Sequence, residues 1–252
     1  MTHPVTTATS SRGPVIGLTA QLVLLAVLAV MHGLSTFGLA TGVVYGLGLC
    51  GLLAAGLERC GMPRLGAANA VTLGRALLVG GVTAMVVTSF SVNISVPLLV
   101  VIAGIALALD GVDGQVARRT GTTTALGARF DMEVDAFLIL VLSVYAGDRF
   151  GWWTVAIGAF RYLFVAASWA MPWLTGALPP RFSRKVVAAV QGVVLALVTA
   201  NLLPHTWAFV ALVVALTSLT WSFGRDIAWL HRAERVRAAA RTRWSAQPAL
   251  AH

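Results

Sequence analysis

Two pairs of aspartates lie between two apolar segments, in a stretch that holds five of the chain's nine acidic residues. Asp110 and Asp113 precede a short loop rich in Gly and Thr, and Asp131 and Asp135 follow it. An α-helix turns about 100° per residue, so the two members of each pair share a helix face. A helical hairpin would bring four carboxylates together, and carboxylates this close stay ionised only beside cations. Because oxygen ligands favour Mg²⁺, Mn²⁺ or Ca²⁺ over zinc, the spacing predicts a divalent metal site.

The residues beside the first pair leave space for a ligand. Gly114 and Ala117 lie on the same predicted helix face and carry almost no side chain, so a flat or phosphorylated group can approach the backbone there. Arg118 stands at the edge of this face, where a guanidinium can hold a phosphate.

Two simpler interpretations of the acidic stretch fit the sequence less well. A solvated loop would have polar flanks, but residues 98–109 and 136–144 are almost wholly apolar, and charge at a membrane is costly and usually functional. A calcium-binding loop needs a Glu six positions after its Gly, and Thr120 stands there instead.

The stretch resembles the motif D-x2-D-G-x2-A-R-x8-G-x3-D-x3-D of the CDP-alcohol phosphotransferases. All eight specified positions are matched, by Asp110, Asp113, Gly114, Ala117, Arg118, Gly127, Asp131 and Asp135. The resemblance implies an integral membrane enzyme of phospholipid biosynthesis. It would move a phosphoalcohol group, here a phosphatidyl group, from a CDP-alcohol lipid such as CDP-diacylglycerol to a second alcohol and release CMP.

The resemblance also implies a role for each motif residue. Two Mg²⁺ or Mn²⁺ ions would be held by Asp110, Asp113, Asp131 and Asp135. Asp135 would also take the proton of the acceptor hydroxyl, as base, metal ligand or both. The nucleotide of the donor would be contacted by Gly114, Ala117, Arg118 and Thr124, and by Asn69 and Thr72 of an N-x2-T-x2-R segment that ends at Arg75. For Asn69 and Thr72, a helix cap and a hydroxyl bonded within its own helix are equally good interpretations.

Three cations are predicted to bind a phosphorylated acceptor. Arg161 lies inside an apolar segment, where an unpaired guanidinium costs about 2.5 kcal/mol or more. Its anion could be the aspartate cluster, an acceptor phosphate or a lipid headgroup. Arg184 and Lys185, followed by Gln191, resemble the basic segment of phosphatidylglycerophosphate synthases, although a positive-inside anchor explains them equally well. Glycerol 3-phosphate is the first prediction and an inositol phosphate the second, while inositol, serine and a second lipid stay open.

The composition predicts an all-α, polytopic integral membrane helical bundle. The chain is 58% hydrophobic and 11% charged, with mean hydropathy +0.84, whereas soluble domains are about a quarter charged. We predict about eight transmembrane helices, the family's six-helix core plus two N-terminal accessory helices, the second of which is rich in Gly and suited to close packing. The predicted divisions are a disordered tail over 1–14, the accessory helices over 15–58, the catalytic core over 69–228 and a basic C-terminal tail over 229–252.

Lys and Arg concentrate in alternate loops and in both tails, which predicts a multi-pass protein of the cell membrane with both termini and the active site on the cytoplasmic side. The formal net charge of +9 does not indicate a nucleic-acid partner, because no nucleic-acid-binding fold accompanies it. Membrane lipids are the expected surroundings, and a homodimer follows from the resemblance alone. Cys50 and Cys60 are too few for a disulfide framework or a thiolate metal site.

Two other functions are weighed against the family. A UbiA-type intramembrane prenyltransferase uses Asp-rich motifs on well separated helices, but only Asp148, Asp226 and Glu234 are acidic after Asp135. A cation transporter could use buried aspartates, but it has no need of the adjoining Gly-x2-Ala-Arg. Release of CMP would separate the three functions.

Overall fold

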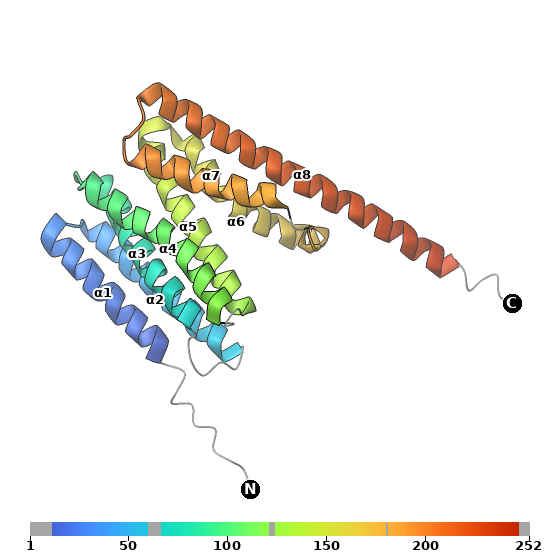
Figure 1. The fold of residues 1–252 in the computed structure, drawn as a ribbon, viewed down its shortest axis with the longest axis horizontal. Helices are drawn as coiled ribbons and strands as arrows, with labels where there is room; N and C mark the ends of the chain where they lie inside the picture. Colours follow the sequence, from blue (N-terminus) through green and yellow to red (C-terminus); the bar gives the residue numbers. More distant parts are fainter. Residues whose placement is uncertain (1–11, 60–66, 121–123, 180, 247–252) are drawn as a thin grey trace, which may run out of the picture.

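The structure, a computed structural model, describes residues 12–59, 67–120, 124–179 and 181–246; side chains at 12, 67–68, 112–120, 125 and 240–246 are left out of the description. The described residues form eight α-helices and two short 3₁₀ helices, with no strand among them (Figure 1). In chain order these are α1 Arg12–His32, α2 Thr36–Arg59, α3 Ala67–Ser89, α4 Val96–Thr120, α5 Ala125–Phe150, η1 Trp152–Thr154, α6 Val155–Ala170, η2 Pro172–Thr175, α7 Phe182–Thr199 and α8 His205–Ala246. The predicted all-α helical bundle is confirmed.

Six helices within the described ranges are long and apolar enough to cross a membrane. The other two are α4, whose apolar part is only Val96–Gly111, and α5, which carries six charged residues. Large apolar side chains such as Val30, Leu52 and Trp169 are mostly exposed, which suits contact with lipid. The chain is therefore an integral membrane protein, and the helices that carry the predicted site are the two that depart from the apolar pattern.

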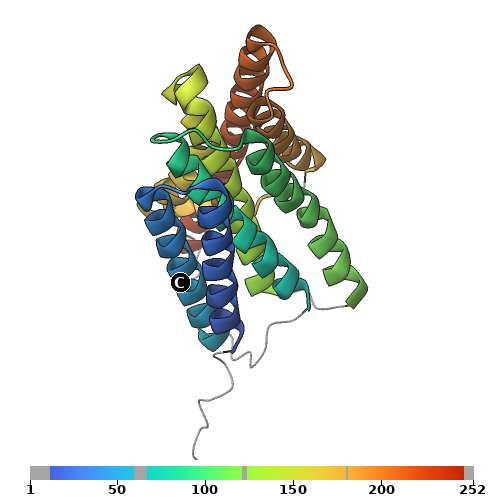
Figure 2. The ribbon, with the colours of Figure 1, turned by 90° about the vertical axis from the view of Figure 1, so that its left-hand side faces the viewer.

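The N-terminal hairpin of α1 and α2 packs on α3 (Figure 2). Small residues make this contact. Gly38, Gly42 and Gly46 recur every four residues on the buried face of α2. A Cβ at Gly38 would lie 2.6 Å from the carbonyl oxygen of Ala84 in α3, and one at Gly42 would lie 2.6 Å from Leu25 in α1. These contacts confirm the close packing predicted for the Gly-rich second helix.

Helix α3 lies at the centre of the bundle and packs against α1, α2, α4 and α5. Its face toward these neighbours includes Ala76, Val79 and Val82, each fully buried. Burial on several sides explains why α3 is apolar around most of its circumference rather than along one stripe. A charged residue in the middle of this helix must therefore find its partner on a neighbouring helix.

Helices α6, α7 and α8 lie on the other side of α5 from the N-terminal hairpin (Figure 1). Helix α6 comes so close to α5 that a Cβ at Gly158 would lie 2.2 Å from the Cα of Leu140. Helix α8 has 42 residues and runs without a break through residue 229, where the basic tail is predicted to begin.

Candidate metal centre

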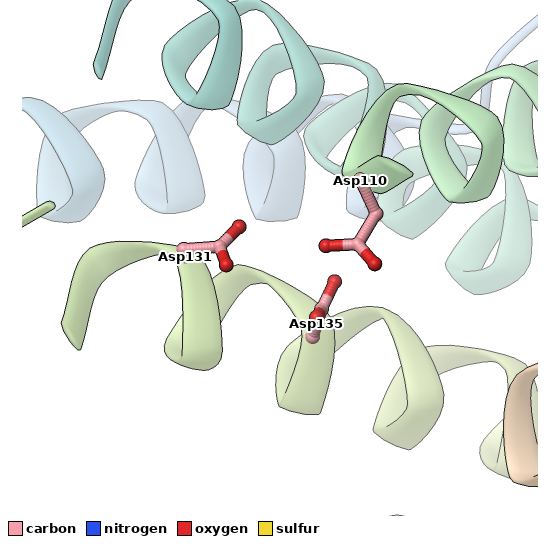
Figure 3. A group of neighbouring side chains, drawn as sticks. All are labelled: Asp110, Asp131 and Asp135. Atoms are coloured by element: carbon pink, nitrogen blue, oxygen red, sulfur yellow. The ribbon is translucent and has the colours of Figure 1, made fainter. Parts of the chain in front are cut away.

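Three carboxylates from two helices meet in the gap between α4 and α5. Asp110 comes from α4, and Asp131 and Asp135 stand one turn apart on α5, with all three side chains pointing toward one another (Figure 3). One oxygen from each lies within 4.8 Å of the others. The side chains are 34–44% exposed, so a ligand can reach them. Three hard oxygen donors at this spacing fit Mg²⁺ or Mn²⁺.

The start of α5 is fixed by contacts that set the position of its aspartates. Thr124 has an extended backbone and caps the helix, because its hydroxyl accepts a hydrogen bond of 3.0 Å from the N–H of Gly127. A Cβ at Gly127 would lie 2.3 Å from Oδ1 of Asn69, so the glycine leaves room for the Asn69 side chain against the start of α5. Asn69 and Thr72 are both buried. Their contact with a nucleotide stays a prediction.

Arg75 lies among the three aspartates and is a site residue that the sequence analysis left without a role. Its side chain is fully buried. Nη1 donates a hydrogen bond to Oδ1 of Asp110 and lies 3.2 Å from Oδ1 of Asp135, while Nη2 donates to Oδ1 of Asp131 and, at 3.2 Å, to the backbone carbonyl of the same residue. The sequence does contain a signal for such a role, because Arg75, like Arg161, lies inside an apolar helix, where a guanidinium needs an anion.

The four described side chains that meet in the centre carry a net negative charge. Three carboxylates and one guanidinium leave these four side chains with a formal charge of −2 when all are ionised. Carboxylates at this separation repel one another unless cations lie between them. A divalent ion would balance the charge, and its preferred oxygen ligands are already gathered.

Arg161, predicted to bind the acceptor, has an acidic partner that was not among the anions considered from the sequence. Arg161 on α6 pairs with Glu133 on α5: Nη2 donates to Oε1, and Nε lies 3.4 Å from Oε2. Glu133 stands two residues from both Asp131 and Asp135, which is about 200° around the helix. The pair therefore lies on a different face of α5 from the three aspartates.

The basic segment at the start of α7 is also paired with an acid. Nη2 of Arg184 donates to the carbonyl of Pro179, and its Nε lies 3.7 Å from Oδ2 of the buried Asp226. Arg225 approaches the same carboxylate at 4.0 Å, and Lys185 is exposed. Two arginines therefore approach one acid, and the exposed Lys185 adds a further positive charge to this segment.

Gln191 serves the packing of α7 on α8. Its buried amide donates a hydrogen bond of 3.1 Å to the carbonyl of Ala215. The remaining predicted residues, Asp113, Gly114, Ala117 and Arg118, lie in the last turns of α4, where side chains fall outside the described set. Their roles stay predictions.

Comparison with known proteins agrees with the site. A family model described as CDP-alcohol phosphatidyltransferase matches residues 65–221, a region that runs from just before α3 into α8 and contains all three clustered aspartates. No curated protein and no solved structure matches the chain. Because the matched region covers more than half of the 252 residues, the chain belongs to the CDP-alcohol phosphatidyltransferase family.

Proposed function

We propose that the protein transfers a phosphatidyl group from a CDP-alcohol such as CDP-diacylglycerol to a small acceptor alcohol in a metal-dependent reaction. The acceptor oxygen forms a bond to the phosphorus that carries the lipid alcohol. The bond from that phosphorus to the bridging oxygen breaks, CMP leaves with the electron pair, and the hydroxyl proton passes to the protein. The meeting of Asp110, Asp131 and Asp135 inside the family region is the observation that carries this proposal.

The aspartates would have two roles, metal binding and proton acceptance. Asp110, Asp113 and Asp131 would hold two Mg²⁺ or Mn²⁺ ions, which when bound supply neutralisation of the diphosphate and of the charge that develops on CMP. Asp135 would accept the proton of the attacking hydroxyl. Its carboxylate stands one turn from Asp131 on α5, so a hydroxyl directed at the donor phosphorus can reach it.

The nucleotide side of the site is proposed from the motif. Gly114 and Ala117 would admit the CDP group close to the helix backbone, and Arg118 would hold a phosphate. Asn69, Thr72 and Thr124 would line the same side, since Asn69 and Thr124 both lie against Gly127 at the start of α5. Alternating basic loops favour a cytoplasmic position for this site and for both termini.

The acceptor is proposed to carry a phosphate, with glycerol 3-phosphate first and an inositol phosphate second. Support comes from the start of α7, where Arg184 shares Asp226 with Arg225 of α8 and Lys185 adds a further positive charge. An anion would balance this excess charge. Arg161 is left out of this acceptor site because Glu133 already supplies the anion on which its assignment depended.

An acceptor screen tests the function. The purified protein is given CDP-diacylglycerol, Mg²⁺ and one candidate alcohol at a time, and CMP release is followed. Asp135→Asn should lower the rate at least about a hundredfold, since a positioned acid or base contributes 10²–10⁴. Asp148→Asn is the matched control, because Asp148 is an exposed acid at the far end of the same helix.

The possible outcomes separate the candidate functions. CMP release that depends on the acceptor and is lost in Asp135→Asn but not in Asp148→Asn supports the proposal. A protein that consumes a prenyl diphosphate and releases pyrophosphate would be a prenyltransferase, and one that moves cations without releasing CMP would be a transporter. Either result would refute the proposed reaction.

A further inference from the structure

Arg75 links the three helices that build the metal centre. Its guanidinium extends from α3 to Asp110 on α4 and to Asp131 and Asp135 on α5. One nitrogen, Nη1, forms ion pairs with Asp110 of α4 and Asp135 of α5. A planar guanidinium with several N–H donors suits this task, whereas a lysine ammonium is a single compact charge.

The position of Arg75 matches that of a cation in the centre of the cluster. The side chain is 0% exposed, although the aspartates that it contacts are each about two-fifths exposed. The guanidinium thus enters from the protein side, and the carboxylates remain open on the other side. Without its charge, three carboxylates within 4.8 Å would repel one another and the gap between α4 and α5 would widen.

We propose that Arg75 is a built-in counter-cation that holds the three carboxylates together, and that a divalent ion competes with it for the same oxygens. The inference rests on the proposed metal site, and it adds a cost to metal binding that the aspartates alone would not impose. Two cations a few ångströms apart repel each other even in a polar site. Arg75 is thus a positioning residue. It keeps the three carboxylates in place before the metal binds, and it lowers the affinity of the site for the metal.

The competition can be measured with Mn²⁺ alone, without turnover. Free Mn²⁺ is titrated into detergent-solubilised protein and followed by electron paramagnetic resonance, and thermal unfolding is recorded with and without Mn²⁺. Arg75→Gln should bind Mn²⁺ at least about tenfold more tightly than the unaltered protein, because a positive charge beside the ion is removed. Without Mn²⁺, this variant should unfold at a lower temperature than the unaltered protein. Added Mn²⁺ should raise its unfolding temperature by more than it raises that of the unaltered protein.

Matched variants exclude a merely structural effect. Arg161→Gln removes another arginine of an ion pair between helices, but its partner is Glu133 on a different face of α5, so its Mn²⁺ affinity should not change. Arg75→Lys keeps the charge and should bind Mn²⁺ much as the unaltered protein does. If Arg75→Gln folds only when Mn²⁺ is present during purification, the ion is replacing the guanidinium and the proposal is supported.

Several results would overturn the proposal. These are an unchanged or weaker Mn²⁺ affinity in Arg75→Gln, equal tightening in Arg75→Gln and Arg75→Lys, or failure of Arg75→Gln to fold even with Mn²⁺. Asp131→Asn separates this failure from failure of the metal site itself. If Asp131→Asn binds Mn²⁺ as well as the unaltered protein, the proposed metal site is wrong; if it binds weakly while Arg75→Gln shows no gain, only the role of Arg75 is wrong.

Discussion

Removing the guanidinium of Arg161 should cost stability rather than acceptor affinity. Its partner Glu133 is contacted through two nitrogen–oxygen pairs, and the two side chains are 32% and 52% exposed. Ion pairs with this exposure contribute about 0.2–1 kcal/mol to the free energy of unfolding. Because both guanidinium contacts fall on one carboxylate, we place the coupling energy near the upper end, at about 1 kcal/mol.

A double-mutant cycle measures this coupling. Arg161→Gln, Glu133→Gln and the double variant are compared by chemical unfolding in detergent, and the double variant should be about 1 kcal/mol more stable than the sum of the single changes predicts. Steady-state assays then give the acceptor KM for each variant. Arg161→Gln should leave that KM nearly unchanged, whereas Lys185→Gln should raise it about tenfold, the effect of losing one charge-assisted hydrogen bond.

One pattern of results would contradict this role of Arg161. If Arg161→Gln raises the acceptor KM about tenfold while the cycle gives no coupling energy, the guanidinium serves the acceptor and the pair with Glu133 is incidental. A rise in the donor KM alone would instead connect Arg161 to the aspartate cluster. If the acceptor KM rises, the proposed acceptor site must include α6, which carries Arg161.

Gly158→Ala should lower the free energy of unfolding by about 3 kcal/mol, because its Cβ would lie 2.2 Å from the Cα of Leu140. Gly104→Ala, where nothing lies within 4 Å, should be neutral or stabilise by up to about 1 kcal/mol, and equal unfolding of the two variants would contradict the packing argument. Excess EDTA should stop CMP release and added Mg²⁺ should restore it; full turnover in EDTA would refute the metal assignment. In a cysteine-free background, a Cys at Leu202 should react with an impermeant maleimide outside intact cells and one at Glu58 only after permeabilisation, and the reverse pattern would overturn the proposed orientation.

The helices and the aspartate cluster could be predicted from the sequence because both depend on short-range patterns. Apolar runs of about 20 residues indicate spans by length alone. The pairs Asp110–Asp113 and Asp131–Asp135 sit at spacings that place their members on one helix face. Helix α5 begins at Ala125, only a few residues after α4 ends at Thr120. The two helices are therefore neighbours in sequence, and the meeting of Asp110 with Asp131 and Asp135 needed no knowledge of the remaining fold.

The partners of the arginines could not be predicted in the same way. Arg75 meets Asp131 across 56 residues of chain, and Arg161 meets Glu133 across 28. Which helix faces which is set by packing features such as the close approach at Gly158, and these are not visible as a local pattern. The need of a buried guanidinium for an anion is predictable, whereas the identity of that anion depends on tertiary structure.

The two N-terminal helices lie outside the matched family region, yet they contact helices that carry the aspartate cluster and Arg75. Tyr45 of α2 donates a hydrogen bond of 3.0 Å to the carbonyl of Ala76, the residue after Arg75, and its ring stacks on Phe137 of α5 at 5.1 Å. One side chain of the hairpin thus touches both α3, which carries Arg75, and α5, which carries Asp131 and Asp135. The guanidinium of Arg75 reaches its aspartates only at a fixed spacing of α3 and α5. We therefore expect the hairpin to help hold the three aspartates together without contributing a side chain to their cluster.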